Sequence, residues 1–120
     1  MRARGERFEA RASEWLGRKG LCLLQRNFRA RTGEIDLIML DGDCLVFVEV
    51  RARAHRGFGG ASASVDHRKQ GRLLRTAQAF LQYNPHYNRL PCRFDVVAFE
   101  PPQSPGDQEI LWIKGAFTGS

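Results

Sequence analysis

Apolar residues recur at two different periods along the chain, and the two periods predict two kinds of element. Helical spacing within residues 6–19 and 66–83 predicts two amphipathic helices, which Gly20 and the Asn84-Pro85 pair would end. Short apolar runs of β character predict strands at 21–28, 34–40, 44–53, 93–99 and 110–114, and 116–120 as a frayed tail. The order αβββαββ predicts an α/β protein, with a mixed β-sheet flanked by helices.

No internal repeat and no linker divides these elements into two domains. A chain of 120 residues fits a single domain with a core of moderate size. We assign residues 5–100 to the α/β core. Residues 101–120 form a connector, the last strand and the tail of the same domain.

The formal net charge is +6, and arginine supplies most of it, which favours a polyanionic partner such as DNA. No apolar run approaches the roughly 20 residues that span a bilayer, and the charged N-terminus is followed by no signal-peptide core. The three cysteines are widely spaced within or beside apolar runs, which predicts buried free thiols. We therefore expect a cytoplasmic protein without a membrane partner.

Two acidic residues interrupt the apolar strands at 34–40 and 44–53, where an uncompensated charge is costly. The intervening Asp41-Gly42-Asp43 is a strong hairpin signal, so we expect the two strands to pair in antiparallel fashion. Each strand has one face that is charged at one end and apolar at the other. Pairing would bring these charged ends together, with Asp36 beside Glu49.

The charged ends of the hairpin have two explanations. A salt-bridge cluster, in which Arg51 or Arg53 neutralises the carboxylates, accounts for the charges without a metal. Alternatively, two convergent carboxylates beside a cation suit a magnesium-dependent phosphodiesterase site. That alternative requires a third acidic group, and Glu9 on the first helix is our candidate. Asp95, at the start of a later strand, is expected to be the partner of an arginine.

A basic surface is expected to follow the acidic hairpin. The second helix carries arginines at i, i+4 and i+7, opposite its apolar face, and Lys69 lies between the two faces. A Gly-rich segment, residues 54–64, separates this helix from the hairpin and is expected to be a mobile loop that contacts DNA. The residues that we expect to contact nucleic acid are Arg53, Arg56, Arg68, Lys69, Arg72 and Arg75.

Several short motifs of this chain form a recognisable combination. They are Gly5-x-x-x-Glu9-x-x-Ala12, Gln25-Arg26-Asn27, Gly33-Glu34-Ile35-Asp36, Val46-Phe47-Val48-Glu49-Val50-Arg51-x-Arg53, Lys69 and Arg93-Phe94-Asp95-Val96-Val97. Together they resemble the YraN family of bacterial proteins, which is similar to Holliday-junction resolvases and to the PD-(D/E)xK nuclease superfamily. The resemblance covers residues 5–100 and implies a restriction-endonuclease-like core with a site built from Glu9, Asp36 and Glu49.

The resemblance also implies a mechanism and partners. Asp36 and Glu49 would hold Mg²⁺ or Mn²⁺, Glu49 would orient the attacking water, and Glu9 would hold a second ion or a water on the first. The substrate would be DNA, including branched intermediates of repair or recombination. A homodimer would supply the two symmetric sites that junction resolution requires.

One residue departs from the superfamily pattern, because Arg51 stands where the motif has lysine. An arginine stays protonated, so it orients phosphate or stabilises charge but cannot activate water by accepting a proton. Lys69 is a candidate to compensate. Three functions therefore remain open: a metal-dependent endonuclease with Glu9, Asp36, Glu49 and Arg51 as catalytic residues, a nucleic-acid-binding protein with this fold but little cleavage, and a structural adaptor.

Overall fold

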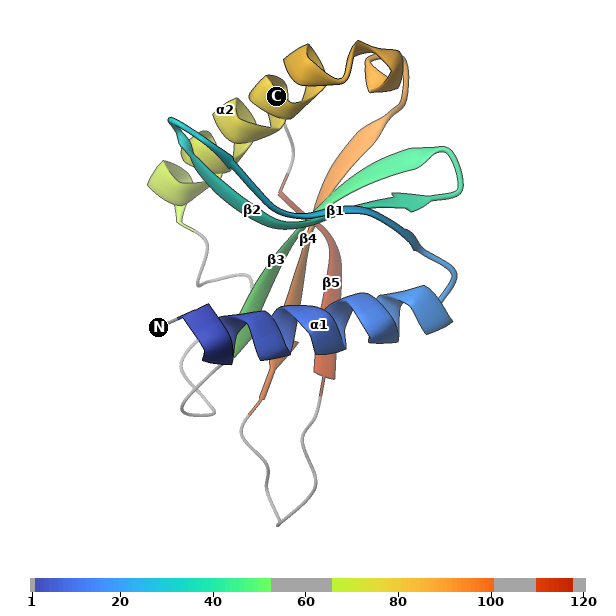
Figure 1. The fold of residues 1–120 in the computed structure, drawn as a ribbon, viewed down its shortest axis with the longest axis vertical. Coiled ribbons are helices and arrows are strands. Elements are labelled where there is room, and N and C mark those ends of the chain that lie inside the picture. Colours follow the sequence, from blue (N-terminus) through green and yellow to red (C-terminus); the bar gives the residue numbers. More distant parts are fainter. Residues whose placement is uncertain (1, 53–65, 101–109, 118–120) are drawn as a thin grey trace.

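The computed structural model describes the backbone of residues 2–52, 66–100 and 110–117, and the side chains of these segments from Arg7 onward (Figure 1). The elements are α1 Arg2–Arg18, β1 Cys22–Ala30, β2 Gly33–Asp41, β3 Cys44–Ala52, α2 His67–Tyr83, the short 3-10 helix η2 Pro85–Tyr87, β4 Cys92–Phe99 and β5 Ile110–Phe117. The predicted α/β class and the order αβββαββ are confirmed. The predicted Gly-rich loop and its neighbours Arg53 and Arg56 lie outside the described residues.

The strands form one mixed sheet in the order β1-β2-β3-β4-β5. The β1–β2, β2–β3 and β4–β5 pairs are antiparallel, as hairpin-like connections allow. The β3–β4 pair is parallel, because α2 carries the chain back across the sheet between these two strands. The antiparallel pairing predicted across Asp41-Gly42-Asp43 is therefore correct, and β1 and β5 form the edges.

The two helices lie on either side of the twisted sheet (Figure 1). Leu45 and Phe47 of β3 join the core under α2, whereas Val46 and Val48 join the core against α1. Side chains alternate between the faces of a strand, so a strand that is covered on both faces reads as a continuous apolar run. Both faces of β3 are therefore core at residues 45–48.

Local sequence signals fix the C-terminal end of α1 and the N-terminal end of α2. Gly20 has a φ of +103°, which is the left-handed conformation that ends α1. Asp66 caps α2 by accepting a 2.9 Å hydrogen bond from the Lys69 backbone nitrogen. This cap fixes where α2 starts, and with it the position of Lys69 in the first turn.

Three expectations from the sequence are wrong in detail. The first helix begins at Arg2 rather than at Glu6. The last strand continues to Phe117, which was expected in the frayed tail, because its ring stacks on Phe94 with a centroid separation of 4.7 Å. The cysteines are free, but they are not buried: Cys22 and Cys92 are exposed on outer strand positions.

Candidate metal centre between two diverging strands

The carboxylates gather where β2 diverges from β3. The paired residues run from Asp41 opposite Cys44 to Leu37 opposite Val48, so the next position of this register brings Asp36 to Glu49. Ile35 and Leu37 would share a face in a regular strand, but they pack into opposite cores. The strand is therefore irregular at Asp36, and its side chain lies in the opening between the strands.

At this opening the Asp36 carboxylate takes the place of a backbone carbonyl as hydrogen-bond acceptor. Its Oδ2 accepts a 2.8 Å hydrogen bond from the Val50 backbone nitrogen, just beyond the last β2–β3 pair. A buried strand N–H needs an acceptor, and here the carboxylate provides it in place of a neighbouring carbonyl. The hydrogen bond holds the Asp36 carboxylate in the opening.

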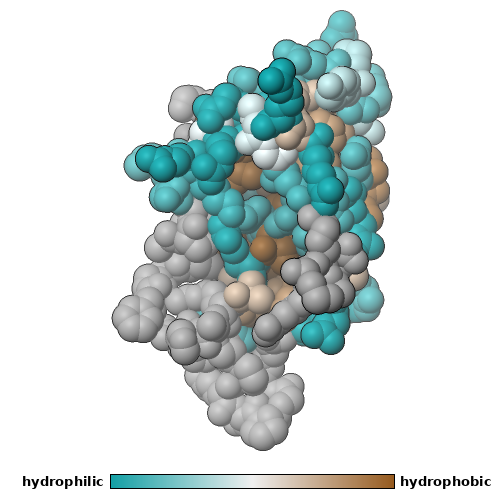
Figure 2. All heavy atoms as spheres, turned by 60° about the vertical axis from the view of Figure 1, so that its left-hand side comes forward, coloured by the Kyte–Doolittle hydropathy of each residue, from teal (hydrophilic) through white to brown (hydrophobic). Residues whose placement is uncertain are grey.

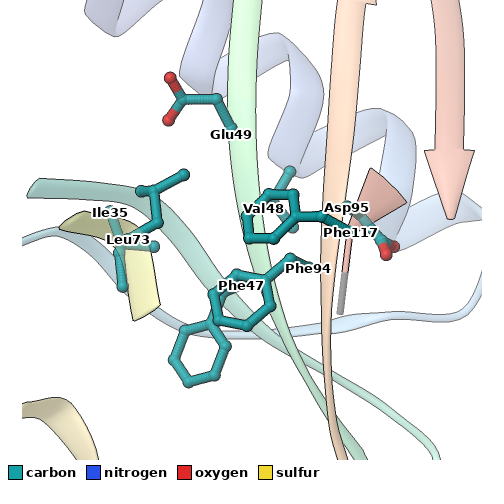
Figure 3. Close-up of a pocket in the computed structure, with 8 residues that line it drawn as sticks. All are labelled: Ile35, Phe47, Val48, Glu49, Leu73, Phe94, Asp95 and Phe117. Atoms are coloured by element: carbon teal, nitrogen blue, oxygen red, sulfur yellow. The ribbon is translucent and has the colours of Figure 1, made fainter. Parts of the chain in front are cut away.

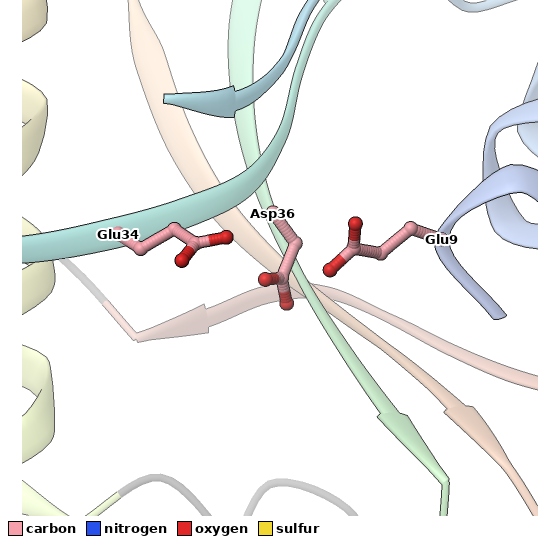
Figure 4. A group of neighbouring side chains, drawn as sticks. All are labelled: Glu9, Glu34 and Asp36. Atoms are coloured by element: carbon pink, nitrogen blue, oxygen red, sulfur yellow. The ribbon is translucent and has the colours of Figure 1, made fainter. Parts of the chain in front are cut away.

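Two further carboxylates converge on Asp36. Glu9 comes from α1 and Glu34 from β2, and one oxygen from each of Glu9, Glu34 and Asp36 lies within 4.8 Å of the others. Figure 4 shows Asp36 between the other two, with all three carboxylates directed toward a common region. Glu9 is only 8% exposed, so part of this negative charge is held away from water. We call these three residues the carboxylate cluster.

Glu49 lies beside the carboxylate cluster and carries the cations. Its Oε2 is 3.2 Å from Arg51 Nη2 and 2.5 Å from Lys69 Nζ. The salt bridge expected between Arg51 and Glu49 is therefore present. Lys69, expected among the residues that contact nucleic acid, reaches into the site from the first turn of α2. Within the described segments, no ion pair reaches Asp36, so salt bridges explain Glu49 but not its neighbour.

The acidic surroundings change the protonation of Asp36. Burial, followed by the negative charge of Glu49, raises its pKa from 3.8 to about 8, and the Glu9 charge and a hydrogen bond to the Glu49 carboxyl act in the same direction. The hydrogen bond from Val50 opposes the rise but does not cancel it. The raised pKa means that Asp36 keeps its proton at neutral pH, unless a cation takes the place of that proton.

Glu34 is the member of the cluster that the sequence reasoning did not assign to the site. Its Oε1 is 3.3 Å from Arg29 Nε, across the β1–β2 pair. A signal for it is present in the sequence, because Glu34 and Asp36 are two residues apart at the start of the predicted strand 34–40. What the sequence did not show was that the strand irregularity would bring Glu34 and Glu9 together.

The other predicted residues lie around this centre. Arg68, Arg72 and Arg75 are exposed on α2, whose opposite side packs on the sheet through Leu73 and Ala77. These arginines contribute to a basic face near the centre without touching the carboxylate cluster in any recorded ion pair. Their contact with nucleic acid stays a prediction.

Asp95 belongs to a different network. It is 1% exposed, and its oxygens accept hydrogen bonds from Arg93, from Trp112 Nε1 at 2.9 Å and from the Gly115 backbone nitrogen at 2.9 Å. Arg93 also lies 2.8 Å from Asp41 at the far end of the hairpin. The expected arginine partner of Asp95 is therefore present.

A small apolar pocket separates Asp95 from the candidate metal centre. Ile35, Phe47, Leu73 and Phe94 are among its lining residues, and it is too narrow to hold a ligand. Figure 3 shows the Glu49 and Asp95 carboxylates at opposite ends of it, each directed away from the pocket. The pocket is part of the core under α2, and the two acidic regions are distinct.

The donor set of the centre suits a hard divalent cation. Mg²⁺ and Mn²⁺ prefer carboxylate oxygens, and Mg²⁺ keeps several waters, so few protein ligands suffice. Three convergent carboxylates and a fourth beside them provide enough oxygen ligands. Burial and the charges of Glu49 and Glu9 raise the pKa of Asp36, and a nearby divalent cation would favour its charged form.

The fold and the site define the class of this protein: a mixed α/β domain with an acidic centre where two central strands diverge. The described helices include none that is long and apolar enough to cross a membrane. The sequence pattern of the uncharacterised protein family UPF0102, the YraN family, matches residues 8–99. The chain belongs to this family.

Relatives of similar length support the assignment. A UPF0102 protein of Pseudomonas putida strain GB-1 is 52% identical over 113 residues, which cover 94% of this chain and 91% of the relative. A UPF0102 protein of Alcanivorax borkumensis is 50% identical over 115 residues, which cover 94% of this chain and 90% of the relative. The matches span almost the whole of each protein, so the compared regions cover the segments that carry the candidate centre.

Proposed function

We propose that this protein is a divalent-metal-dependent endonuclease that acts on DNA, including branched intermediates of repair or recombination. The observation that carries the proposal is the convergence of Glu9, Glu34 and Asp36, whose carboxylate oxygens lie within 4.8 Å of one another. Such a concentration of negative charge destabilises a fold unless a counter-ion or a proton compensates it. Phosphodiester hydrolysis on a bound cation is a use that fits both the carboxylates and the basic chain.

Each acidic residue has a role in this proposal. Asp36 and Glu49 would hold Mg²⁺ or Mn²⁺, with Glu9 and Glu34 as further ligands or as acceptors for waters. When bound, the ion would supply Lewis acidity toward the phosphodiester and charge to stabilise the leaving oxygen. The Val50 N–H fixes Asp36 in place, which keeps one ligand oriented before an ion arrives.

Lys69 takes the place near Glu49 that the motif lysine would otherwise hold. Its ammonium lies 2.5 Å from Glu49 Oε2, so it holds this carboxylate in one orientation. A lysine in this position is also within reach of a scissile phosphate oxygen, whose charge it would stabilise. Arg51 would contribute a second fixed positive charge, without accepting a proton.

The proposed DNA substrate leads to expectations about the compartment and the oligomeric state of the protein. A net charge of +6 favours a polyanionic partner. The resemblance to junction resolvases suggests DNA as that partner. We expect the protein in the cytoplasm with the bacterial chromosome, where its free thiols would stay reduced. A homodimer would be required if both strands of a junction are cut.

Cleavage of defined DNA substrates tests the proposal. We would incubate the protein with labelled four-way junction, flap and plain duplex DNA in Mg²⁺ or Mn²⁺ and compare it with Asp36→Asn and Glu9→Gln. Both variants should lose cleavage, because each removes a ligand charge. Asp43→Asn, on the exposed β2–β3 turn, is the matched control and should cleave normally. Equal cleavage by Asp36→Asn and the wild-type protein would refute the proposal.

A second candidate is a DNA-binding protein that keeps the fold and the ion but does not cleave. The presence of Arg51 on Glu49 favours it, since an arginine cannot take a proton from water. This candidate predicts salt-dependent binding of DNA without products in any divalent ion. Cleavage gained by Arg51→Lys would place the wild-type protein one residue from activity.

A further inference from the structure

The β1–β2 hairpin carries a basic tip that the proposed function has not used. The tip, residues 29–33, includes Arg29 and Arg31, which are both exposed. The turn that follows β1 brings the chain directly into Gly33 and the carboxylate-bearing strand β2. Figure 1 shows this tip beside α2.

Hydrogen bonds fasten the tip to α2. Thr76 is fully buried and donates its hydroxyl proton to the Arg72 carbonyl at 2.8 Å. A hydroxyl has one proton, so Thr32 is the donor in the 2.7 Å contact between the two threonine oxygens. Gly33 follows with a φ of +149°, a backbone conformation that disfavours residues with a side chain, so glycine suits this turn. The tip is thus held in a defined position.

This attachment joins two basic surfaces that are far apart in sequence. Thr32 follows Arg31, and Thr76 follows Arg75 and is bonded to the carbonyl of Arg72. The tip is therefore in contact with the part of α2 that carries Arg72 and Arg75. Figure 2 shows the side of the molecule that includes this region, with hydrophilic side chains around a hollow in which apolar residues are visible.

The basic tip also borders the candidate metal centre. Arg29 contacts Glu34 of the carboxylate cluster, and on the other side Lys69 of α2 contacts Glu49. Arg31 lies in the two-residue turn beyond the Ala30–Gly33 pair, so at 3.3 Å per strand residue it is roughly 10–13 Å along the hairpin from Asp36. DNA rises 3.4 Å per base pair, so this distance corresponds to about three to four base pairs.

We propose that the hairpin tip is a second DNA contact, in which Arg31, supported by Arg29, binds backbone phosphates about three to four base pairs from the phosphate at the metal centre. The inference rests on the proposed function and adds to it the path of the duplex: from the centre, along α2, to the tip. Arg29 takes part because its pair with Glu34 is half-exposed and weak, so it exchanges readily for phosphate.

DNA fits the tip better than an acidic protein does. Protein interfaces have an apolar centre, whereas phosphate contacts need only charge and hydrogen-bond donors. The tip itself has no large apolar side chain. Of the exposed large hydrophobic residues in the described segments, Tyr83 packs on Phe28 just before the tip, and Leu23 lies further back in β1. Guanidinium groups on a fixed turn suit a regular backbone of phosphates.

Duplex binding in EDTA, as a function of salt, tests the inference without requiring cleavage. Arg31→Gln should raise the Kd of a labelled 20-base-pair duplex about three- to tenfold and reduce the salt slope of log K by about 1, because one phosphate contact is lost. Arg89→Gln is the matched control: Arg89 is also exposed, but it lies near the start of β4, away from the centre. It should leave both values unchanged.

Other outcomes overturn the inference. An Arg31→Gln variant that binds like Arg89→Gln would do so, as would a wild-type protein that binds no duplex. Binding of polyglutamate that duplex DNA does not displace would assign the tip to an acidic protein instead. Arg31→Glu should raise the Kd more than Arg31→Gln does, so it is a second variant in case the effect of Arg31→Gln is small. A thermal melt of each variant checks that it is folded. Failure of the tip leaves the Asp36-dependent cleavage intact, so the two proposals fail separately.

Discussion

Asp36 and Asp95 lie on strands of the same sheet, yet their carboxylates meet opposite surroundings. Asp95 accepts hydrogen bonds from Arg93, Trp112 and Gly115, and its charge is compensated within the fold. Asp36 accepts one from Val50 and otherwise faces carboxylates. An apolar pocket lies between the two regions (Figure 3).

The fold compensates the charge of Asp95 but not the charge of Asp36. Donors from β4 and β5 complete the surroundings of Asp95, so its charge stabilises the sheet. Burial, followed by the negative charges of Glu49 and Glu9, raises the pKa of Asp36 to about 8, so its charge opposes folding. A site that is costly to the fold by itself is the kind that a bound cation makes favourable.

The largest expected effect comes from breaking the Asp95 network. Asp95→Ala would leave the Arg93 guanidinium, the Trp112 N–H and the Gly115 N–H without their buried acceptor. We expect a loss of about 3–5 kcal/mol in the free energy of unfolding, measured by urea denaturation. Asp43→Ala, on the exposed turn, should stay within about 0.5 kcal/mol. A loss no larger than that of this control would contradict the structural role.

At Asp36 we expect the opposite effect, a rise in the free energy of unfolding. Asp36→Asn keeps an oxygen for the Val50 N–H but removes the charge, so at pH 8 without metal it should stabilise the protein by about 1–3 kcal/mol. Because the pKa is raised, the wild-type contribution is fully present below the unfolded value of 3.8 and is lost as the pH rises toward about 8. Asp36→Asn should lack this decline. Parallel stability curves for the two proteins between pH 4 and 8 would contradict the raised pKa.

A divalent ion should remove the same cost by binding. Mn²⁺ at ten times its Kd should stabilise the wild-type protein by about 1.4 kcal/mol at pH 8, seen as a rise in Tm. Asp36→Asn should show a smaller rise, and Asp43→Asn the full one. If Mn²⁺ raises all three melting temperatures equally, the ion acts outside the carboxylate cluster.

Arg51→Lys should have the smallest effect on stability and the most informative one on chemistry. Both side chains are cations that reach Glu49, so the free energy of unfolding should change by less than about 0.5 kcal/mol. Cleavage of junction or flap DNA in Mn²⁺ should increase if a second lysine helps to activate water. Cleavage already present in the wild type and abolished by Lys69→Met would instead assign that role to Lys69.

Much of the centre follows from local pattern. Alternation along β2 and β3 and the Asp41-Gly42-Asp43 turn predicted the pairing that brings Asp36 to Glu49. Turn chemistry and strand period are local properties, so they are readable from residues that are close in sequence. The tail residue Phe117 was missed because a single aromatic contact, with Phe94, extends the last strand beyond its apolar run.

The sequence by itself determined the elements, their order and the meeting of two charged strand ends. The tertiary structure decided which carboxylate receives the cations: Lys69 and Arg51 bind Glu49, and Asp36 is left among acids. It also decided that Glu34 joins the cluster and that the hairpin tip rests on α2. These outcomes depend on the divergence of two strands and on the packing of both helices, and long-range distances of that kind follow from the whole core rather than from any local pattern.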